Sequence, residues 1–206
     1  MFETIIETCN KLEKEFDLIT AERKKKLREL SAYIATTYQQ KVTPKLIVIC
    51  THNSRRSHLG QIWLSLAAAY YQLPSIETYS GGTAATAFYK SGVEALRKIG
   101  LQIEAPPTST SNPIYSISWN EKMKPYHAFS KVFSESPNPT QDFGAILVCN
   151  SASEACPIVH GADFRIAIPY VDPKAFDNTE LESQKYEERC LQIGREFLYT
   201  FSLIKT

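Results

Sequence analysis

The chain has 206 residues, of which 43% are hydrophobic and 22% are charged, and its formal net charge is +1. This size and composition are typical of one substantial soluble domain. The near-zero charge gives no electrostatic reason to expect binding to nucleic acid or to an acidic membrane. No apolar run reaches the roughly 18 residues that span a bilayer, and the N-terminus lacks the basic and apolar regions of a signal peptide. We therefore expect a cytoplasmic protein.

Helices and strands are predicted to alternate after a long N-terminal helix. Residues 2–40 place apolar side chains at helical spacing without Gly or Pro, which predicts a helix that ends before Pro44. Strands are predicted at 45–50, 75–82, 145–149 and 164–170, and helices at 57–71, 86–100 and 179–204. We expect Gly100 to close the helix before it. Residues 112–133 interrupt this alternation and are predicted to form an inserted hairpin of two strands around a polar turn.

The alternation indicates an α/β fold class, in which helices cover a parallel sheet. We expect a three-layer α/β/α sandwich around a four-stranded, mainly parallel sheet. Residues 1–42 are predicted to form an N-terminal helical extension, and residues 43–206 the main domain, with its insertion at 112–133. The active site is expected at the carboxyl end of the first strand, where ligands bind in open α/β sheets.

A short stretch, LIVICTHNSRRS (residues 46–57), carries the strongest functional signal. A buried strand ends at Cys50, and a polar loop then leads into a helix. Such a loop points backbone N–H groups inward, and together with the helix dipole they form an anion site. The same positive field lowers the pKa of a thiol, so Cys50 is expected to attack as a thiolate. We expect oxyanion contacts from the cradle loop, residues Thr51, His52, Asn53, Ser54, Arg55 and Arg56.

Individual residues of this stretch have distinct expected roles. Arg56 can clamp two oxygens of a tetrahedral oxyanion, and the hydroxyl of Ser57 can donate to the cysteine sulfur. Asn53 tolerates a left-handed backbone conformation and can hydrogen-bond the loop. A buried structural cysteine beside a basic turn is the competing interpretation. The apolar strand before Cys50 and the amphipathic helix after it favour the catalytic one.

The cysteine, the arginine six positions later and the following serine resemble the loop of the low-molecular-weight protein tyrosine phosphatase superfamily. The matching residues are Cys50, Asn53, Arg56 and Ser57. That superfamily places its general acid in a downstream Asp-Pro pair, and this chain has Asp172-Pro173 after its fourth predicted strand. The resemblance therefore implies that Asp172 protonates the leaving oxygen, and that the strand order is 2-1-3-4. Asp-Pro is also common in turns.

The stretch LVCNSASEACP, residues 147–157, adds a cysteine pair. Cys149 ends a predicted strand, and Cys156 follows seven residues later, before Pro157. From Cys149 to Asp172 the chain resembles the thioredoxin-coupled arsenate reductases, which share the phosphatase fold; the whole resemblance spans residues 45–105 and 143–200. It implies that Cys50 attacks arsenate, that Cys149 then attacks Cys50 and releases arsenite, and that Cys156 moves the disulfide to where thioredoxin reduces it.

The resemblance also implies which partners the protein has, but it does not assign a role to residues 1–42 and 112–133. We expect no tightly bound cofactor, a tetrahedral oxyanion substrate, thioredoxin as reductant, and neither nucleic acid nor membrane as partner. No His/Cys spacing indicates a zinc site, and Cys9 and Cys190 are expected to be structural. Residues 1–42 and 112–133 are absent from small reductases of the family. Homodimerisation through the N-terminal helices, cover for the active site and recruitment of a partner are alternative roles.

Two residues depart from the family's loop pattern, and two other functions compete with arsenate reduction. His52 stands where the family commonly has glycine, and Arg55 is unusual beside Arg56. The first alternative function is a phosphatase that hydrolyses phosphotyrosine or small phosphomonoesters through a phosphocysteine at Cys50, with Cys149 and Cys156 protecting it from oxidation. The second is a non-catalytic redox sensor or interaction module. The cysteine pair discriminates reductase from phosphatase, because a phosphatase keeps turnover without it.

Overall fold

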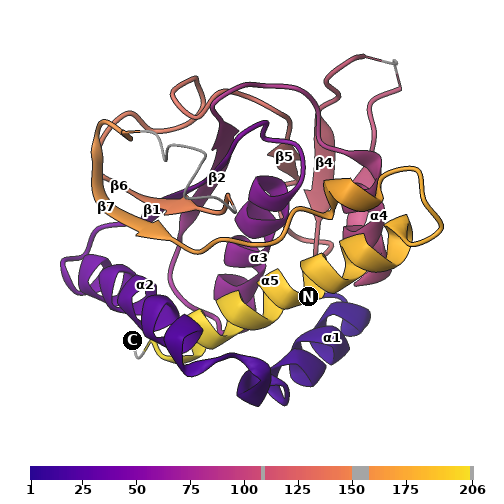
Figure 1. Cartoon of the computed structure of the whole chain (residues 1–206). Helices are drawn as coiled ribbons and strands as arrows, with labels where there is room; N and C mark the ends of the chain where they lie inside the picture. Colours follow the sequence, from indigo (N-terminus) through magenta and orange to yellow (C-terminus); the bar gives the residue numbers. More distant parts are fainter. Residues whose placement is uncertain (108–109, 150–157, 205–206) are drawn as a thin grey trace.

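The computed structural model describes residues 1–107, 110–149 and 158–204 (Figure 1). Its main sheet contains the strands β1 (Lys45–Cys50), β2 (Glu77–Gly82), β6 (Phe143–Leu147) and β7 (Ala162–Ala167). The order is β2-β1-β6-β7, and every neighbouring pair is parallel. In sequence order these strands read 2-1-3-4. The predicted α/β class, the parallel four-stranded sheet and its strand order are confirmed.

Both faces of β1 are buried, which explains why its sequence is apolar without alternation. Leu46, Val48 and Cys50 belong to the main hydrophobic core, whereas Ile47 and Ile49 belong to a second, smaller core on the other face. This smaller core also contains Phe143, Ala145, Leu147 and Val159. The central strand is therefore held from two sides, and the position of its last residue, Cys50, is fixed by packing.

The helices α3 (Arg56–Tyr70), α4 (Lys90–Lys98) and α5 (Glu182–Ser202) lie together on one side of the main sheet (Figure 1), and each contributes buried residues to the main core. Buried residues of α5 recur at helical spacing, from Tyr186 to Phe201. The α4 helix is shorter than the predicted helix 86–100, because residues 86–89 bond to other segments: the Tyr89 N–H donates to the Ser54 carbonyl at 2.9 Å. Gly100 follows α4 with a φ of +104°, as expected of a residue that closes a helix.

The N-terminal segment corrects one prediction. The single helix predicted over 2–40 is two helices, α1 (Glu3–Glu13) and α2 (Ala21–Gln39), separated by a short 3-10 turn, η1 (Phe16–Leu18). Thr20 caps the second helix, and its hydroxyl accepts from the Arg23 N–H at 3.3 Å. The break lets both helices pack against α5. The boundary at residue 42 and a homodimer through these helices stay predictions.

A second sheet contains β3 (Gln102–Glu104), β4 (Tyr115–Ser118) and β5 (Tyr126–Ala128), all antiparallel. The β4–β5 pair confirms the hairpin predicted within 112–133. The sequence did not predict β3, because three residues are too few to show an alternating pattern. The Tyr126 hydroxyl donates to the Thr78 carbonyl at 2.5 Å and thereby attaches the insertion to β2. Within the described residues, no helix is long and apolar enough to cross a membrane.

Candidate active site

Cys50 is the last residue of β1, and α3 begins six residues later at Arg56. The thiol is buried, and its Sγ lies 3.0 Å from the Ser57 Oγ. The Asn53 side-chain N–H donates to the same Oγ at 2.9 Å. Because Oγ accepts this bond, its own hydrogen is available for the sulfur. The structure therefore places Ser57 as a hydrogen-bond donor to Cys50, an arrangement that stabilises a thiolate.

Asn53 fixes the shape of the cradle loop. Its φ is +43°, a left-handed conformation that asparagine tolerates better than most residues. It is fully buried, and its side-chain oxygen accepts from the Lys131 N–H at 2.8 Å. The amide thus connects the loop both to Ser57 and to the segment that follows β5. Its side chain supports the loop, and its predicted contact with an oxyanion stays a prediction.

Gly82, the last residue of β2, lies directly opposite Cys50 in the sheet. A Cβ at this position would lie 2.6 Å from the Asn53 N and 2.8 Å from the Thr51 O. Both atoms are backbone of the cradle loop, so a larger residue cannot be accommodated by moving a side chain. The absence of a side chain at Gly82 is what lets the loop close over the end of β2.

The substitution Gly82→Ala is expected to weaken phosphate binding at the cradle by about tenfold or more, because the loop must move away from its anion-binding shape. Titration calorimetry measures this affinity. The matched control is Gly194→Ala, whose Cβ would lie 2.5 Å from the Trp63 ring, inside the core and away from the loop. This control is expected to lower the unfolding temperature and leave the cradle's affinity unchanged. Equal losses of affinity in both variants would contradict the role assigned to Gly82.

Arg56 connects the start of α3 to the segments that follow β6 and β7. It is 5% exposed, and its Nη1 donates to the carbonyls of Val148 at 3.2 Å and Tyr170 at 2.9 Å. Its Nη2 donates to Asp172 Oδ2 at 2.6 Å. The Nε is buried and has no hydrogen-bond partner among the described residues. Buried guanidinium donors are normally satisfied, so Nε and Nη2 are the positions at which an oxyanion would bind.

Asp172, the residue expected to act as general acid, lies at the cradle. It caps the short 3-10 helix η2 (Pro173–Phe176), and its Oδ1 accepts from the Lys174 N–H at 3.0 Å. Its side chain is 32% exposed, so the carboxyl can reach both substrate and water. A small cavity is lined by Asp172 together with Cys50, Thr51, His52, Ser54, Arg55 and Arg56. The structure therefore brings the expected nucleophile, the loop and the acid into one cavity.

The guanidinium of Arg55 points into a cluster of its own. Its Nε donates to the Tyr186 hydroxyl at 2.5 Å, and its Nη2 forms an ion pair with Asp177. It also stacks over the Tyr89 ring, 4.4 Å from the centroid. Asp177 neutralises this charge, and the side chain of Arg55 holds the end of η2 and α5 together. No spacing in the sequence indicated this cluster, because Asp177 and Tyr186 are distant in the chain.

The second expected thiol lies beside the cradle. The pairing of β1 with β6 sets Ile49 opposite Leu147, so the residues two positions further along, Thr51 and Cys149, are also neighbours. Thr51 Oγ1 lies 3.5 Å from Cys149 Sγ. Cys149 is half-buried against the main core. Cys156, the expected third thiol, lies outside the described residues.

Two buried basic residues, His58 and Lys131, both contact Asn53 of the cradle loop and were not predicted as site residues. His58 stacks on Phe88 with ring centroids 4.2 Å apart, and burial, assisted by the nearby charge of Lys131, lowers its pKa to about 3. His58 is therefore neutral near pH 7. Burial also lowers the pKa of Lys131, to about 8. The Lys131 ammonium lies 4.6 Å from the Phe129 ring centroid.

Cys9 and Cys190 behave as structural residues. Both are buried, and burial raises the pKa of each thiol to about 12. Trp63 Nε1 donates to Cys190 Sγ at 3.3 Å. Thiols with such pKa values are not nucleophiles near pH 7. The described part of the chain contains no cluster of three or more His, Cys, Asp or Glu that could hold a metal ion.

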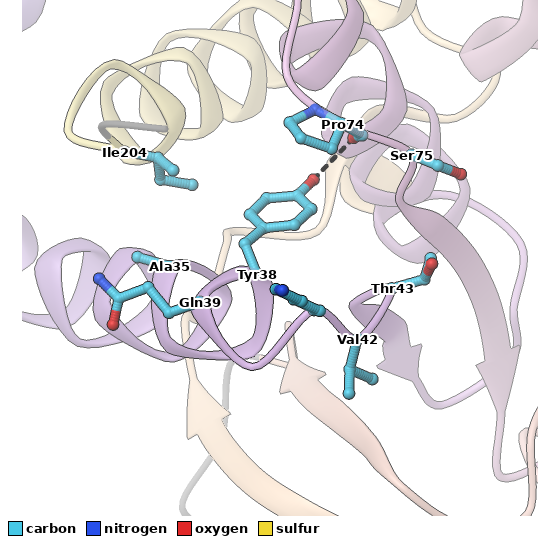
Figure 2. Close-up of a pocket in the computed structure, with 9 residues that line it drawn as sticks. Ala35, Tyr38, Gln39, Val42, Thr43, Pro74, Ser75 and Ile204 are labelled. Atoms are coloured by element: carbon cyan, nitrogen blue, oxygen red, sulfur yellow. Dashed lines mark hydrogen bonds between the residues drawn. The ribbon is translucent and has the colours of Figure 1, made fainter.

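Two larger cavities differ in their relation to the cradle. A groove of about 610 Å³ lies beside it, and its lining includes His52 and Arg55 of the loop as well as Tyr89 and Tyr115. Another cavity has a volume of about 470 Å³. It lies between the end of α2 and the segment that precedes β2 (Figure 2). There the Tyr38 hydroxyl donates to the Pro74 carbonyl at 2.9 Å. The cavity in Figure 2 adjoins the starts of β1 and β2, so it lies away from the cradle at their carboxyl ends.

Comparison with known proteins supports the fold. No family model and no curated protein matches the chain. A mutant of YwlE from Bacillus subtilis is 13% identical over 80% of this chain and 100% of its own, with a TM-score of 0.52. A low-molecular-weight phosphotyrosine phosphatase from Vibrio cholerae O395 is 15% identical over 76% and 93%, with a TM-score of 0.49. A thioredoxin-dependent arsenate reductase from Corynebacterium glutamicum is 16% identical over 98% of both chains, with a TM-score of 0.44. The likeness to the YwlE mutant supports the fold of this chain.

Proposed function

We propose that the chain is an enzyme of tetrahedral oxyanions that reduces arsenate, with Cys50 as nucleophile and Cys149 as the second thiol. The observation that carries this proposal is the position of Cys149. It lies at the carboxyl end of the strand next to β1, within 3.5 Å of the residue that follows the nucleophile. Hydrolysis of an ester through Cys50 needs no second sulfur for turnover, whereas reduction of arsenate by thiols does.

In the first step the Cys50 thiolate attacks the arsenic of an arsenate held by the cradle. Arg56 holds the oxyanion through Nε and Nη2, and the loop N–H groups hold the remaining oxygens. A sulfur–arsenic bond forms, and an arsenic–oxygen bond breaks. Asp172 supplies the proton, so that the oxygen leaves as water. The Ser57 hydroxyl, 3.0 Å from the sulfur, stabilises the thiolate before the attack.

In the second step the Cys149 thiolate attacks the sulfur of Cys50. A disulfide forms, the sulfur–arsenic bond breaks, and its electron pair remains on arsenic, which leaves as arsenite. Two thiols are oxidised, and arsenic gains two electrons. Cys156 then attacks Cys149 and releases Cys50. The dithiol of thioredoxin supplies the two electrons that reduce the new disulfide.

A phosphomonoester phosphatase is the second candidate, and the groove beside the cradle favours it. At about 610 Å³ the groove has more room than a bare oxyanion needs, and two tyrosines, Tyr89 and Tyr115, line it. An aromatic leaving group such as the phenol of phosphotyrosine fits such a lining. The first step would be the same at phosphorus. Water would then hydrolyse the phosphocysteine, and Cys149 would protect Cys50 from oxidation.

The test measures two activities of one sample: NADPH oxidation with arsenate, thioredoxin and thioredoxin reductase, and hydrolysis of p-nitrophenyl phosphate. The wild type is expected to oxidise NADPH only when arsenate is present. Cys149→Ser is expected to lower this turnover by about 10³-fold or more, because the disulfide cannot form, and to bind phosphate normally. The control Cys9→Ala removes a buried cysteine outside the site and is expected to keep full turnover.

Fast ester hydrolysis without arsenate-dependent NADPH oxidation would overturn the reductase and leave the phosphatase. Arsenate-dependent turnover that survives in Cys149→Ser would overturn the assigned role of Cys149.

A further inference from the structure

A cavity of about 320 Å³ lies between the start of α2, residues 169–171 and α5. We propose that this cavity is a second binding site for a tetrahedral oxyanion, either free or as the phosphate of a small monoester. It is separate from the cradle, and the two cavities share no lining residue. The proposal concerns binding and does not depend on which reaction the cradle catalyses.

The charges of the lining residues do not balance. Three arginines, Arg23, Arg189 and Arg195, face a single acid, Glu196. Arg23 uses this acid, with its Nε 2.7 Å from Glu196 Oε2, and Arg195 pairs at 2.7 Å with Glu15, outside the cavity. Arg189 donates to the Gln192 side-chain oxygen and makes no ion pair among the described residues. Burial lowers the pKa of Arg189, while the nearby Tyr170, Glu196 and Glu188 act in the opposite direction. A bound anion would add a direct partner for this guanidinium.

Two donors of the lining side chains are buried without hydrogen-bond partners among the described residues, namely Nε of Arg189 and Nε of Arg195. Tyr170 is 1% exposed, and its pKa is raised chiefly by burial; its hydroxyl has Glu196 and Arg23 as neighbours. Unsatisfied buried donors are rare in folded proteins. Two of them beside one cavity indicate an acceptor with several oxygens.

The N-terminus of α2 adds partial positive charge at the same cavity. Thr20, the residue that caps this helix, lines the cavity. The helix has 19 residues, so its dipole places partial positive charge at this end. Thr20 and Arg23 both come from the N-terminal segment. The proposed site therefore gives residues 1–42 a function besides packing, since the main domain alone would lack part of the lining.

The cavity shares a wall with the segment that carries the catalytic acid. Arg23 Nη2 donates to the Pro169 carbonyl at 2.8 Å, and its guanidinium lies 4.5 Å from the centroid of the Tyr170 ring. The Tyr170 carbonyl in turn accepts from Arg56 Nη1, and Asp172 follows two residues later. An anion bound to the arginines would hold residues 169–172 from the side opposite the cradle. An anion bound at the second site is therefore expected to stabilise the position of Asp172.

The test is titration calorimetry at constant low ionic strength, with inorganic phosphate and with glycerol 3-phosphate, on the full chain carrying Cys50→Ser to prevent turnover. Two binding events are expected. Arg189→Gln is expected to weaken one of them by about tenfold or more and to leave the other within about twofold, because one charged donor is lost. Lys25→Gln, the same charge change on an exposed residue of α2, is the matched control and is expected to keep both events.

A folded Arg189→Gln protein that binds phosphate and glycerol 3-phosphate like the Lys25→Gln control would overturn the proposal. If circular dichroism shows that Arg189→Gln is unfolded, Arg195→Gln takes its place with the same expectation. Loss of an event seen with both ligands, or with phosphate alone, supports a site for the free oxyanion. Loss of an event seen only with glycerol 3-phosphate supports a site for monoesters.

Discussion

The substitution Cys50→Ser is expected to abolish both arsenate-dependent NADPH oxidation and ester hydrolysis, by about 10⁴-fold or more. A serine hydroxyl is a much weaker nucleophile than a cysteine sulfur, and no general base among the described residues is placed beside it to activate it. The hydroxyl also cannot form the disulfide that reduces arsenic. Phosphate binding is expected to persist within about threefold, because Arg56 and the loop N–H groups remain in place. Steady-state assays and titration calorimetry measure the two properties separately.

Loss of turnover with retained binding is what distinguishes a nucleophile from a structural cysteine. Replacing a structural cysteine at the end of β1 would lower the stability and the phosphate affinity together. The Cys9→Ala protein is the control for the loss of a buried cysteine. Cys9 is buried like Cys50 but lies in α1, away from the cradle. Residual turnover above about one per cent of wild type in Cys50→Ser would place the nucleophile elsewhere in the chain.

The core of the site was predictable from the sequence because its signals are local. The continuous apolar run before Cys50 indicates a strand buried on both faces, and β1 has this burial. The amphipathic residues after Arg56 indicate a helix, and α3 begins at that residue. Together they place a loop between the end of a strand and the start of a helix, which is the geometry of an anion cradle. The prediction that Asp172 lies at this loop came from the family resemblance, because Asp172 and Arg56 are 116 residues apart in the chain.

Other features depend on contacts that no local pattern records. The apolar spacing of residues 2–40 continues through the break between α1 and α2, so periodicity alone indicated one helix. Threonine commonly caps the N-terminus of a helix, so Thr20 is the residue in the sequence that indicates a new helix starting after it. The sequence predicted that Arg55 contacts the oxyanion. In the structure its side chain is instead bound to Asp177 and Tyr186, which lie on distant elements. The arginine cavity likewise joins α2, α5 and residues 169–171, which are far apart in the chain.

Asp172→Asn is expected to change turnover and binding in opposite directions. The carboxylate lies 2.6 Å from Arg56 Nη2 when no substrate is bound, so it occupies a donor that an oxyanion needs. It also repels the oxyanion as a like charge. An amide removes the repulsion and competes more weakly, so the affinity for phosphate should rise by about threefold to tenfold. The amide cannot supply a proton, so turnover of phenyl phosphate should fall by about 10²- to 10³-fold.

The leaving group separates these two effects. A p-nitrophenolate needs little protonation to leave, so hydrolysis of p-nitrophenyl phosphate in Asp172→Asn should fall less than hydrolysis of phenyl phosphate. The inhibition constant of phosphate, measured in the same assay, reports the change in affinity. The control is Asp177→Asn, which removes a carboxylate from the Arg55 cluster beside the cradle and leaves the Arg56–Asp172 pair in place. If both esters slow equally in Asp172→Asn while phosphate binding is unchanged, Asp172 neither protonates the leaving group nor competes for Arg56. The carboxylate at the cradle then only holds the turn before η2, through its bond to the Lys174 N–H.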